Sequence, residues 1–186
     1  MSTLSFPSRG LSRQVRQTLL VQARPSAPTK GILRLGNLRV PCALGRSGIT
    51  HNKREGDGGT PVGRFELIEI RYRADRIHRP RTTLPLRASQ PLDGWCDAVG
   101  DRNYNRPVRM PYPKSAETMW RADNLYDVVV ILDWNVSRRS QGRGSAIFFH
   151  LARPGFTPTE GCVAVQLHDM RRILQRLRRG AAIEVR

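Results

Sequence analysis

The sequence predicts a mainly β fold with one helix near its C-terminal end, in the α+β class. Its 186 residues include 16 Gly and 13 Pro against 5 Phe, 3 Trp and 4 Tyr, and this composition favours turns and strands over a helical bundle. Hydrophobic residues make up 39% and charged residues 25%. The chain is therefore expected to fold as one globular domain with its own core.

Residues 1–29 are predicted to form a basic tail or capping segment. The segment has several arginines and no acidic residue, and it ends in the Pro25–Pro28 break, which reads as a stiff linker. Its longest apolar run, Leu19–Val21, is shorter than the roughly 7 to 15 residues of a secretory signal core. No signal peptide is visible, and the folded domain is predicted to span residues 30–186.

The first strands of the domain are predicted on either side of a two-residue turn. Ile32–Leu35 and Leu38–Val40 flank Gly36-Asn37, two residues that tolerate the positive φ of a hairpin turn. A longer strand is expected at Phe65–Tyr72, where apolar residues occur on both faces of the alternating pattern.

The second half of the chain contains buried strands, a helix and a closing strand. Tyr126–Leu132 and Ala146–Phe149 are short β-branched or aromatic runs that we expect to be neighbours in a sheet. Leu167–Leu177 has apolar residues at helical spacing, with Gly180 as the expected C-cap. Ala182–Val185 is predicted as the last strand of the sheet.

The charge and the cysteines limit the partners and cofactors. A net charge of +17 indicates an anionic partner, but no zinc-finger spacing, RNP pattern or basic heptad region accompanies it, so no nucleic-acid partner is expected. Cys42, Cys96 and Cys162 cannot all pair, and none lies in a CxxC motif, so no metal site is predicted. No cofactor and no membrane span are expected, and the sequence leaves the oligomeric state open.

The segment from Phe149 to Val165 carries the most reactive side chains. His150 ends a predicted buried strand, and Cys162 follows a loop with Pro and Gly residues that can fold back toward it. A free thiol has a pKa near ~8.5, so a neighbouring imidazole that lowers it would make Cys162 a nucleophile. Gly161 leaves room for a carbonyl substrate, and backbone N–H groups beside it are candidate oxyanion donors. The alternative is a buried, inert cysteine.

A second segment, Lys53–Phe65, is rich in glycine and leads into a strand. It lacks the Gly-Lys-Ser/Thr ending of a phosphate-binding loop and precedes a strand instead of a helix, so it is a tight connection by its residues alone. Asp57–Phe65 and Thr159–Cys162 together resemble the motifs of YkuD-type L,D-transpeptidases, which have Asp-Gly-x-Thr-Pro-x-Gly-x-Phe and Ser/Thr-x-Gly-Cys in this order.

Other segments strengthen the resemblance, which spans about residues 31–177. They are Asp93–Asp97, Tyr104-Asn105, Ser115–Glu117 and Gly144–Phe148. The resemblance implies a β-sandwich or barrel-like arrangement of sheets and a cysteine acyltransferase. The implied catalytic residues are Cys162, His150, Gly161 and Thr159. Residues expected to line a substrate cleft are Arg153, Tyr104, Asn105, Trp95 and Glu117.

The implied activity is cross-linking of peptidoglycan stem peptides through a Cys162 thioester, at a periplasmic or cell-wall location. The family's arginine two positions after the cysteine is Ala164 here, so Arg153, Arg138 or Arg139 would have to supply that charge. Three alternatives stay open: an L,D-carboxypeptidase, a transpeptidase that uses another L-centre of the stem, and a basic β-rich module that binds an anionic polymer or nucleic acid.

Overall fold

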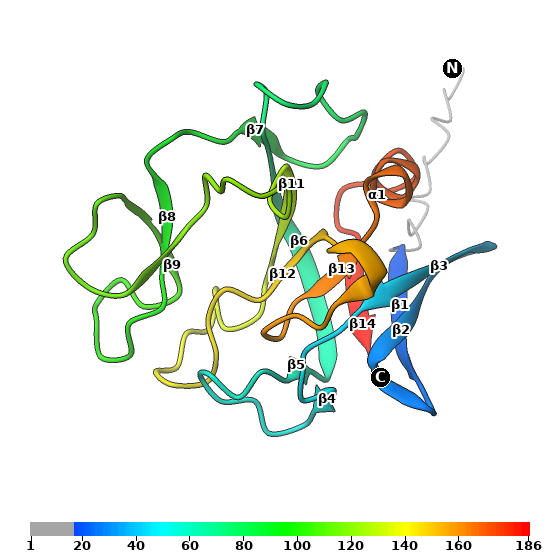
Figure 1. Cartoon of the computed structure of the whole chain (residues 1–186), viewed down its shortest axis with the longest axis horizontal. Helices are drawn as coiled ribbons and strands as arrows, with labels where there is room; N and C mark the ends of the chain where they lie inside the picture. Colours follow the sequence, from blue (N-terminus) through cyan, green and yellow to red (C-terminus); the bar gives the residue numbers. More distant parts are fainter. Residues whose placement is uncertain (1–16) are drawn as a thin grey trace, which may run out of the picture.

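The protein folds around one large sheet that closes on itself, as Figure 1 shows for the computed structural model, which describes residues 17–186. Its strands are β1 (Thr18–Arg24), β2 (Ala27–Leu35), β3 (Leu38–Ala43), β6 (Gly63–Tyr72), β7 (Leu86–Ala88), β11 (Val128–Leu132), β12 (Phe148–Leu151), β13 (Val163–Val165) and β14 (Ala182–Val185). Their order is β11-β12-β13-β3-β2-β1-β14-β6-β7, and β11 also pairs with β6. This last pairing makes the sheet a closed, barrel-like ring from which β7 branches.

Two small sheets and two helical segments complete the described chain. β8 (Asp93–Cys96) lies between β9 (Arg106–Arg109) and β10 (Ala116–Thr118), and this group forms a lobe beside the barrel (Figure 1). β4 (Ile49–Thr50) pairs in parallel with β5 (Thr60–Pro61). The helical segments are the short 3₁₀ turn η1 (Pro154–Phe156) and the helix α1 (Leu167–Leu174).

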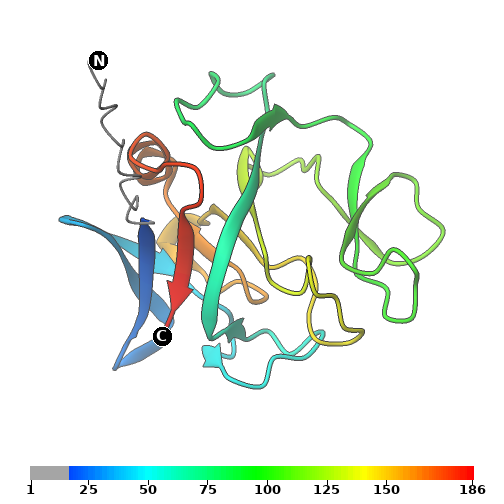
Figure 2. The same cartoon turned by 180° about the vertical axis from the view of Figure 1, so that it is seen from behind.

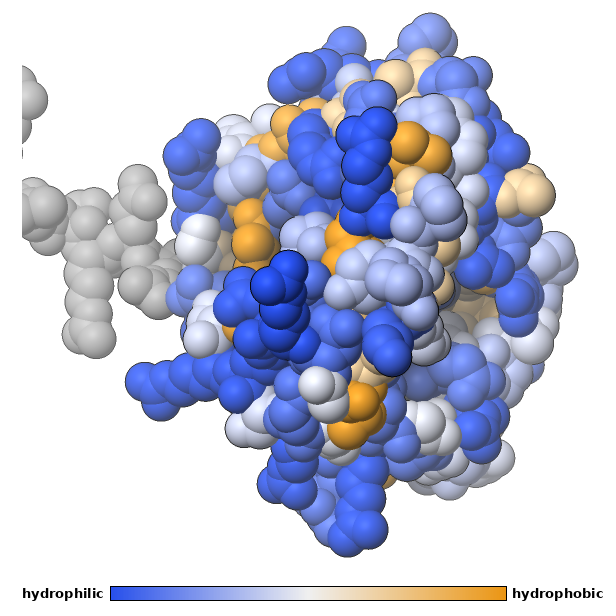
Figure 3. Space-filling view, turned by 90° about the vertical axis from the view of Figure 1, so that its left-hand side faces the viewer, coloured by the Kyte–Doolittle hydropathy of each residue, from blue (hydrophilic) through white to orange (hydrophobic). Residues whose placement is uncertain are grey.

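The apolar side chains form two clusters on opposite faces of the sheet. The larger cluster fills the barrel and includes Phe149, Val163 and the α1 residue Ile173. The smaller one joins the sheet to the lobe and includes Phe148 and Cys162. The outer face on the lobe side is mostly hydrophilic, with apolar residues in small separate patches (Figure 3). The candidate nucleophile therefore lies at the junction between barrel and lobe.

The predicted fold class is confirmed: strands dominate, and α1 is the one α-helix among the described residues. The hairpin is confirmed with Leu35 opposite Leu38, the neighbouring strands are confirmed as β11 and β12, and β14 spans the predicted Ala182–Val185. The helix ends at Leu174 instead of Leu177, and Gly180 adopts its positive φ of 78° in the turn before β14.

The alternation predicted for β6 changes phase within the strand. Ile131 faces Glu69 whereas Leu132 faces Leu67, so β6 has one extra residue at position 68, a β-bulge. As a result Leu67 and Ile70 both face the barrel core, and Ile68 is 37% exposed.

The predicted boundary at residue 30 is wrong for residues 18–29. Strand β1 lies between β2 and β14, side by side with β14 and β6 in Figure 2, and Leu19 and Val21 are fully buried in the barrel core. The Pro25–Pro28 segment is the turn and the start of β2, not a linker. Because of its arginines the segment was interpreted as a polar tail, although the first residues of β1 alternate between more and less buried positions. Residues 1–16 of the predicted tail lie outside the described residues.

Replacing Leu19 with Ala should lower the free energy of unfolding by about 2 to 5 kcal/mol, because the change leaves a cavity in a closed core. Chemical denaturation followed by circular dichroism measures this. The exposed β1 residue Gln22 is the control, and Gln22→Ala should stay within about 0.5 kcal/mol of the parent. Equal, negligible effects of both changes would show that β1 does not belong to the folded core.

Candidate active site

Cys162 and His150 lie on one face of two neighbouring strands. β12 and β13 pair in parallel with Phe149 opposite Val163 and His150 opposite Ala164. Because side chains alternate along a strand, Phe149 and Val163 enter the barrel core, and His150 and Cys162 face the other way. Both line one cavity of about 460 Å³.

The Cys162 thiol is buried and held by two backbone groups. Its Sγ accepts a hydrogen bond from the Phe148 N–H and donates one to the Ala146 carbonyl, each at 3.3 Å. Burial raises the pKa of this thiol to about 12, and the negative charge of Glu117 contributes to the shift. At neutral pH the side chain is therefore a protonated thiol, which would have to lose its proton to act as a nucleophile.

The His150 ring is fixed in an orientation suited to a base. Nδ1 lies 2.9 Å from the Leu151 carbonyl oxygen, which can only accept, so Nδ1 carries the proton and Nε2 keeps its lone pair. The Tyr126 ring meets the imidazole edge-on at 5.3 Å between centroids. Burial lowers the pKa of His150 to about 4, so the ring is neutral at pH 7. The resting pair is thus a neutral thiol and a neutral imidazole, not the thiolate that the sequence led us to expect.

Thr159 and Gly161 shape the turn before Cys162. Thr159 Oγ1 donates to the Cys162 carbonyl at 2.7 Å and accepts the Gly161 N–H at 3.2 Å. Gly161 has φ of 130°, and a Cβ there would lie 2.8 Å from the Gly59 carbonyl oxygen. Only glycine fits this position. The Gly161 N–H, expected as an oxyanion donor, is already used by Thr159.

The backbone that carries the Ala146 carbonyl has an unusual conformation. Ala146 has φ of 51° and Gly144 has φ of 92°. The Ala146 N–H donates to Asn105 Oδ1 at 3.0 Å, which fixes the left-handed residue in place. Asn105 thereby controls where the carbonyl that accepts from the Cys162 thiol lies.

Of the five residues expected to bind substrate, the structure brings two to the cavity. Arg153 and Glu117 line it. Trp95 and Asn105 are buried beside it, where the Trp95 indole N–H donates to Asn105 Oδ1 at 2.9 Å. Tyr104 is also buried, and its hydroxyl donates to Glu55, which does line the cavity. The three aromatic or amide side chains therefore support the walls instead of lining them.

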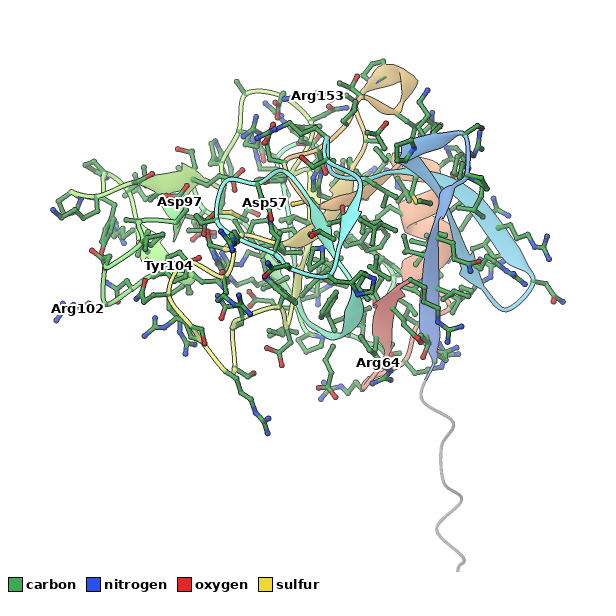
Figure 4. The ribbon with its side chains drawn as sticks, turned by 90° about the horizontal axis from the view of Figure 1, so that it is seen from below. Asp57, Arg64, Asp97, Arg102, Tyr104 and Arg153 are labelled. Carbon is green, nitrogen blue, oxygen red and sulfur yellow. The ribbon has the colours of Figure 1, made fainter. Side chains whose placement is uncertain are left out.

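The cavity contains charges of both signs that the net charge does not predict. Figure 4 shows Arg153 well separated from Tyr104 and from Arg102 at the outer end of the lobe. The acidic side chains that line the cavity are Glu55, Asp97, Glu117 and Glu160, and the basic ones are Lys53, Arg121 and Arg153. Sequence reasoning missed Lys53, Arg121 and Tyr126 as lining residues. Their positions gave no signal, because the spacing of residues in an irregular loop does not fix which side chains meet.

Ala164 also lines the cavity, at the position where the resemblance led us to expect an arginine. Arg121 and Arg153 bring guanidinium groups to the same space, whereas Arg139 donates to the Tyr104 carbonyl at 2.9 Å and does not line the cavity. Arg138, the remaining candidate, does not line it either. Asp123 holds Arg121 through two hydrogen bonds of 2.7 Å. Arg153 is exposed and has more freedom to meet an anionic group.

The described residues contain no group of three or more His, Cys, Asp or Glu side chains placed to hold a metal ion. All three cysteines are free and buried, so Cys42 and Cys96 are not paired in this structure. From residue 17 onward, no helix combines the length and hydropathy that crossing a membrane requires.

The fold and the cavity define a closed β-sheet protein with a cysteine and a histidine at one site. The chain belongs to the YkuD family of L,D-transpeptidase catalytic domains, which matches residues 29–185. A search of curated proteins found no match. Among solved structures, the chain is similar to L,D-transpeptidase 1 of Mycobacterium tuberculosis at 14% identity and a TM-score of 0.38, covering 91% of this chain and 62% of the other. The chain thus spans less than two thirds of that protein's length.

Replacing Asn105 with Ala should lower the free energy of unfolding by about 2 to 4 kcal/mol, measured by denaturation. The buried amide makes four hydrogen bonds, two of them from Nδ2 to the Trp134 and Asn135 carbonyls at 3.1 and 2.7 Å, and the change leaves these partners unpaired. Asn103→Ala, two residues earlier, is the control and should have a smaller effect, because that amide donates one side-chain hydrogen bond, to the Tyr112 hydroxyl. A neutral Asn105→Ala would contradict the supporting role assigned here.

His150 should make the protein less stable as the pH falls. Its folded pKa is about 4, below the usual 6.5, so the unfolded chain binds more protons between these values. The contribution is complete above pH 6.5, is lost progressively as the pH falls toward 4, and amounts to about 3 kcal/mol. Denaturation of the parent and of His150→Gln across pH 4 to 7 measures it. Identical pH profiles for the two proteins would contradict this assignment.

Proposed function

We propose that the protein is a peptidoglycan L,D-transpeptidase that acts through a Cys162 thioester. The observation that carries the proposal is that Cys162 and His150 lie on one face of paired strands and line one cavity. Family membership supports the reaction class, and the family acts on peptidoglycan peptides, typically outside the cytoplasm.

In the proposed acylation, Cys162 Sγ attacks the carbonyl between the L-centre of a diamino-acid residue and the following D-residue of a stem peptide. The thiol proton passes to His150 Nε2 as the carbon–sulfur bond forms, and the imidazolium then protonates the leaving amine. A thioester and a free D-amino acid result. The neutral resting pair supports this order, because both groups are in the protonation state the step requires.

In the second step an amine of another stem attacks the thioester. His150 takes a proton from that amine, and the thiol is released in its protonated form. The product is an amide cross-link. The cavity's mixed charges suit such substrates, because a stem peptide offers carboxylates to Arg153 and an ammonium group to Glu117.

Two variants of this chemistry remain as alternatives. If water resolves the thioester, the protein is an L,D-carboxypeptidase. If the donor bond lies at another L-centre of the stem, a different cross-link forms, and the small Ala164 in place of an arginine favours this variant, because it changes the shape and charge of the donor side of the cavity. The products of the two variants differ in mass from the proposed cross-link.

The alternative of another class is a basic module that binds an anionic polymer. The net charge of +17 favours it. The four carboxylates that line the cavity do not suit a polyanion at this site, so such a partner would have to use the outer surface. Binding of this kind falls steeply with salt and is indifferent to Cys162.

Replacing Cys162 with Ala should reduce cross-linking of tetrapeptide muropeptides at least about 1,000-fold, because the change removes the nucleophile. Mass spectrometry of the products separates cross-linked, trimmed and unreacted stems. Cys42→Ala is the matched control, since Cys42 is buried in the barrel core away from the cavity. It should retain activity within a fewfold of the parent.

Full turnover by the Cys162→Ala protein would end the proposal. A parent that only trims stems would identify the carboxypeptidase, and a cross-link of different mass would identify another donor centre. An intact-mass adduct of a carbapenem on Cys162, absent from Cys162→Ala, gives a second readout of the nucleophile.

A further inference from the structure

Lys53 is a buried lysine in the wall of the cavity. It is 4% exposed and lies in the glycine-rich loop whose two ends are joined by the β4–β5 pair. Its ammonium group forms an ion pair with Asp57, which is labelled in Figure 4. Asp57 also accepts the Gly59 N–H at 2.8 Å and the Arg54 N–H at 2.7 Å, so the carboxylate that holds Lys53 is itself fixed.

The Lys53 side chain passes between the two segments that position the thiol. A Cβ on Gly144 would lie 2.9 Å from Lys53 Cε, so the aliphatic stem packs against the backbone that leads to Ala146. A Cβ on Gly161 would lie 3.3 Å from Lys53 Nζ, so the ammonium group meets the residue immediately before Cys162. Glycine at both positions leaves the space that this lysine occupies.

The charge of Lys53 opposes that of two carboxylates that act on the thiol. Glu117 and Glu160 both disfavour the thiolate, whereas the positive charge of Lys53 favours it and works to lower the pKa of Cys162. The neutral His150 gives no such help before it takes a proton. The Gly161 N–H is used by Thr159. Besides Lys53, the titratable and charged groups that share the cavity with the thiol are His150, Tyr126, Glu55, Asp97, Glu117, Glu160, Arg121 and Arg153.

We propose that Lys53 is a positioning residue whose ammonium group stabilises the negative charge on Cys162 when the thiol proton has passed to His150 Nε2. The inference rests on the proposed function for its role in turnover, but its effect on the thiol is separate from any substrate. Asp57 then has two effects: it holds the lysine in place, and its negative charge weakens the field that the thiol experiences.

This double effect separates an electrostatic role from a merely structural one. Lys53→Met and Asp57→Asn both break the same ion pair, so a structural role predicts that they change the thiol in the same direction. An electrostatic role predicts opposite directions, because the first removes a positive charge near Cys162 and the second removes a negative one.

The test is the rate at which iodoacetamide alkylates Cys162 at a fixed pH of about 8, with the peptide that carries Cys162 quantified by mass spectrometry. A neighbouring charge shifts a pKa by about one unit or more, and the lower nucleophilicity of a less basic thiolate offsets part of that effect. Lys53→Met should therefore slow alkylation about three- to tenfold, and Asp57→Asn should accelerate it. Lys53→Arg, which keeps the charge, should stay nearer to the parent than Lys53→Met.

The matched control is Lys114→Met, which removes a lysine that does not line the cavity and should leave the rate unchanged. Thermal melting shows which variants fold.

Equal slowing by Lys53→Met and Asp57→Asn, or no change with Lys53→Met, would overturn the inference. If Lys53→Met does not fold, the inference is tested with Asp57→Asn alone. Slower alkylation of Cys162 in that variant than in the parent would overturn the inference. The predicted alkylation pattern in a protein that makes no cross-link would refute the proposed function and leave this inference standing.

Discussion

The parallel pairing of β12 with β13 determines whether the site exists. His150 lies opposite Ala164, and this register puts Cys162 on the same side of the sheet as the imidazole. A slip by one residue would turn Cys162 into the barrel core and bring Val163 to the cavity, because side chains alternate. The register is held from both sides, since Phe149 and Val163 are buried in one cluster and Phe148 and Cys162 in the other.

At this site, burial disfavours the charged forms of the thiol and the imidazole, whereas the fixed groups around them favour charge as it develops. Removing the thiol and the imidazole from water disfavours their charged forms, so the resting pair is neutral. The same exclusion of water strengthens the fields that act on charge as it develops. Fixed backbone groups supply the compensation: the Leu151 carbonyl at the end of β12 holds the ring, and the turn built by Thr159 and Gly161 holds Cys162.

The sequence was informative where the signal was local. We could predict the hairpin turn and the closing strand from composition and alternation. The motif spacing likewise identified Cys162 and His150 as candidate site residues. Strand β1 could not, since its neighbours β14 and β2 decide its burial and one of them comes from the far end of the chain. Asn105 was expected at the substrate for the same reason: its hydrogen bonds go to residues 95, 134, 135 and 146, which only the fold brings together.

The parallel alignment of Thr18–Val21 with Ala182–Val185 has a consequence for biosynthesis. β14 fills the place between β1 and β6, so the ring cannot close until β14 has left the ribosome. Until then β1 and β6 each present an unpaired edge, the kind of surface on which nascent chains associate wrongly. A chain that stops before β14 would lack the shared neighbour of both strands, and chaperones or proteases would meet an open sheet.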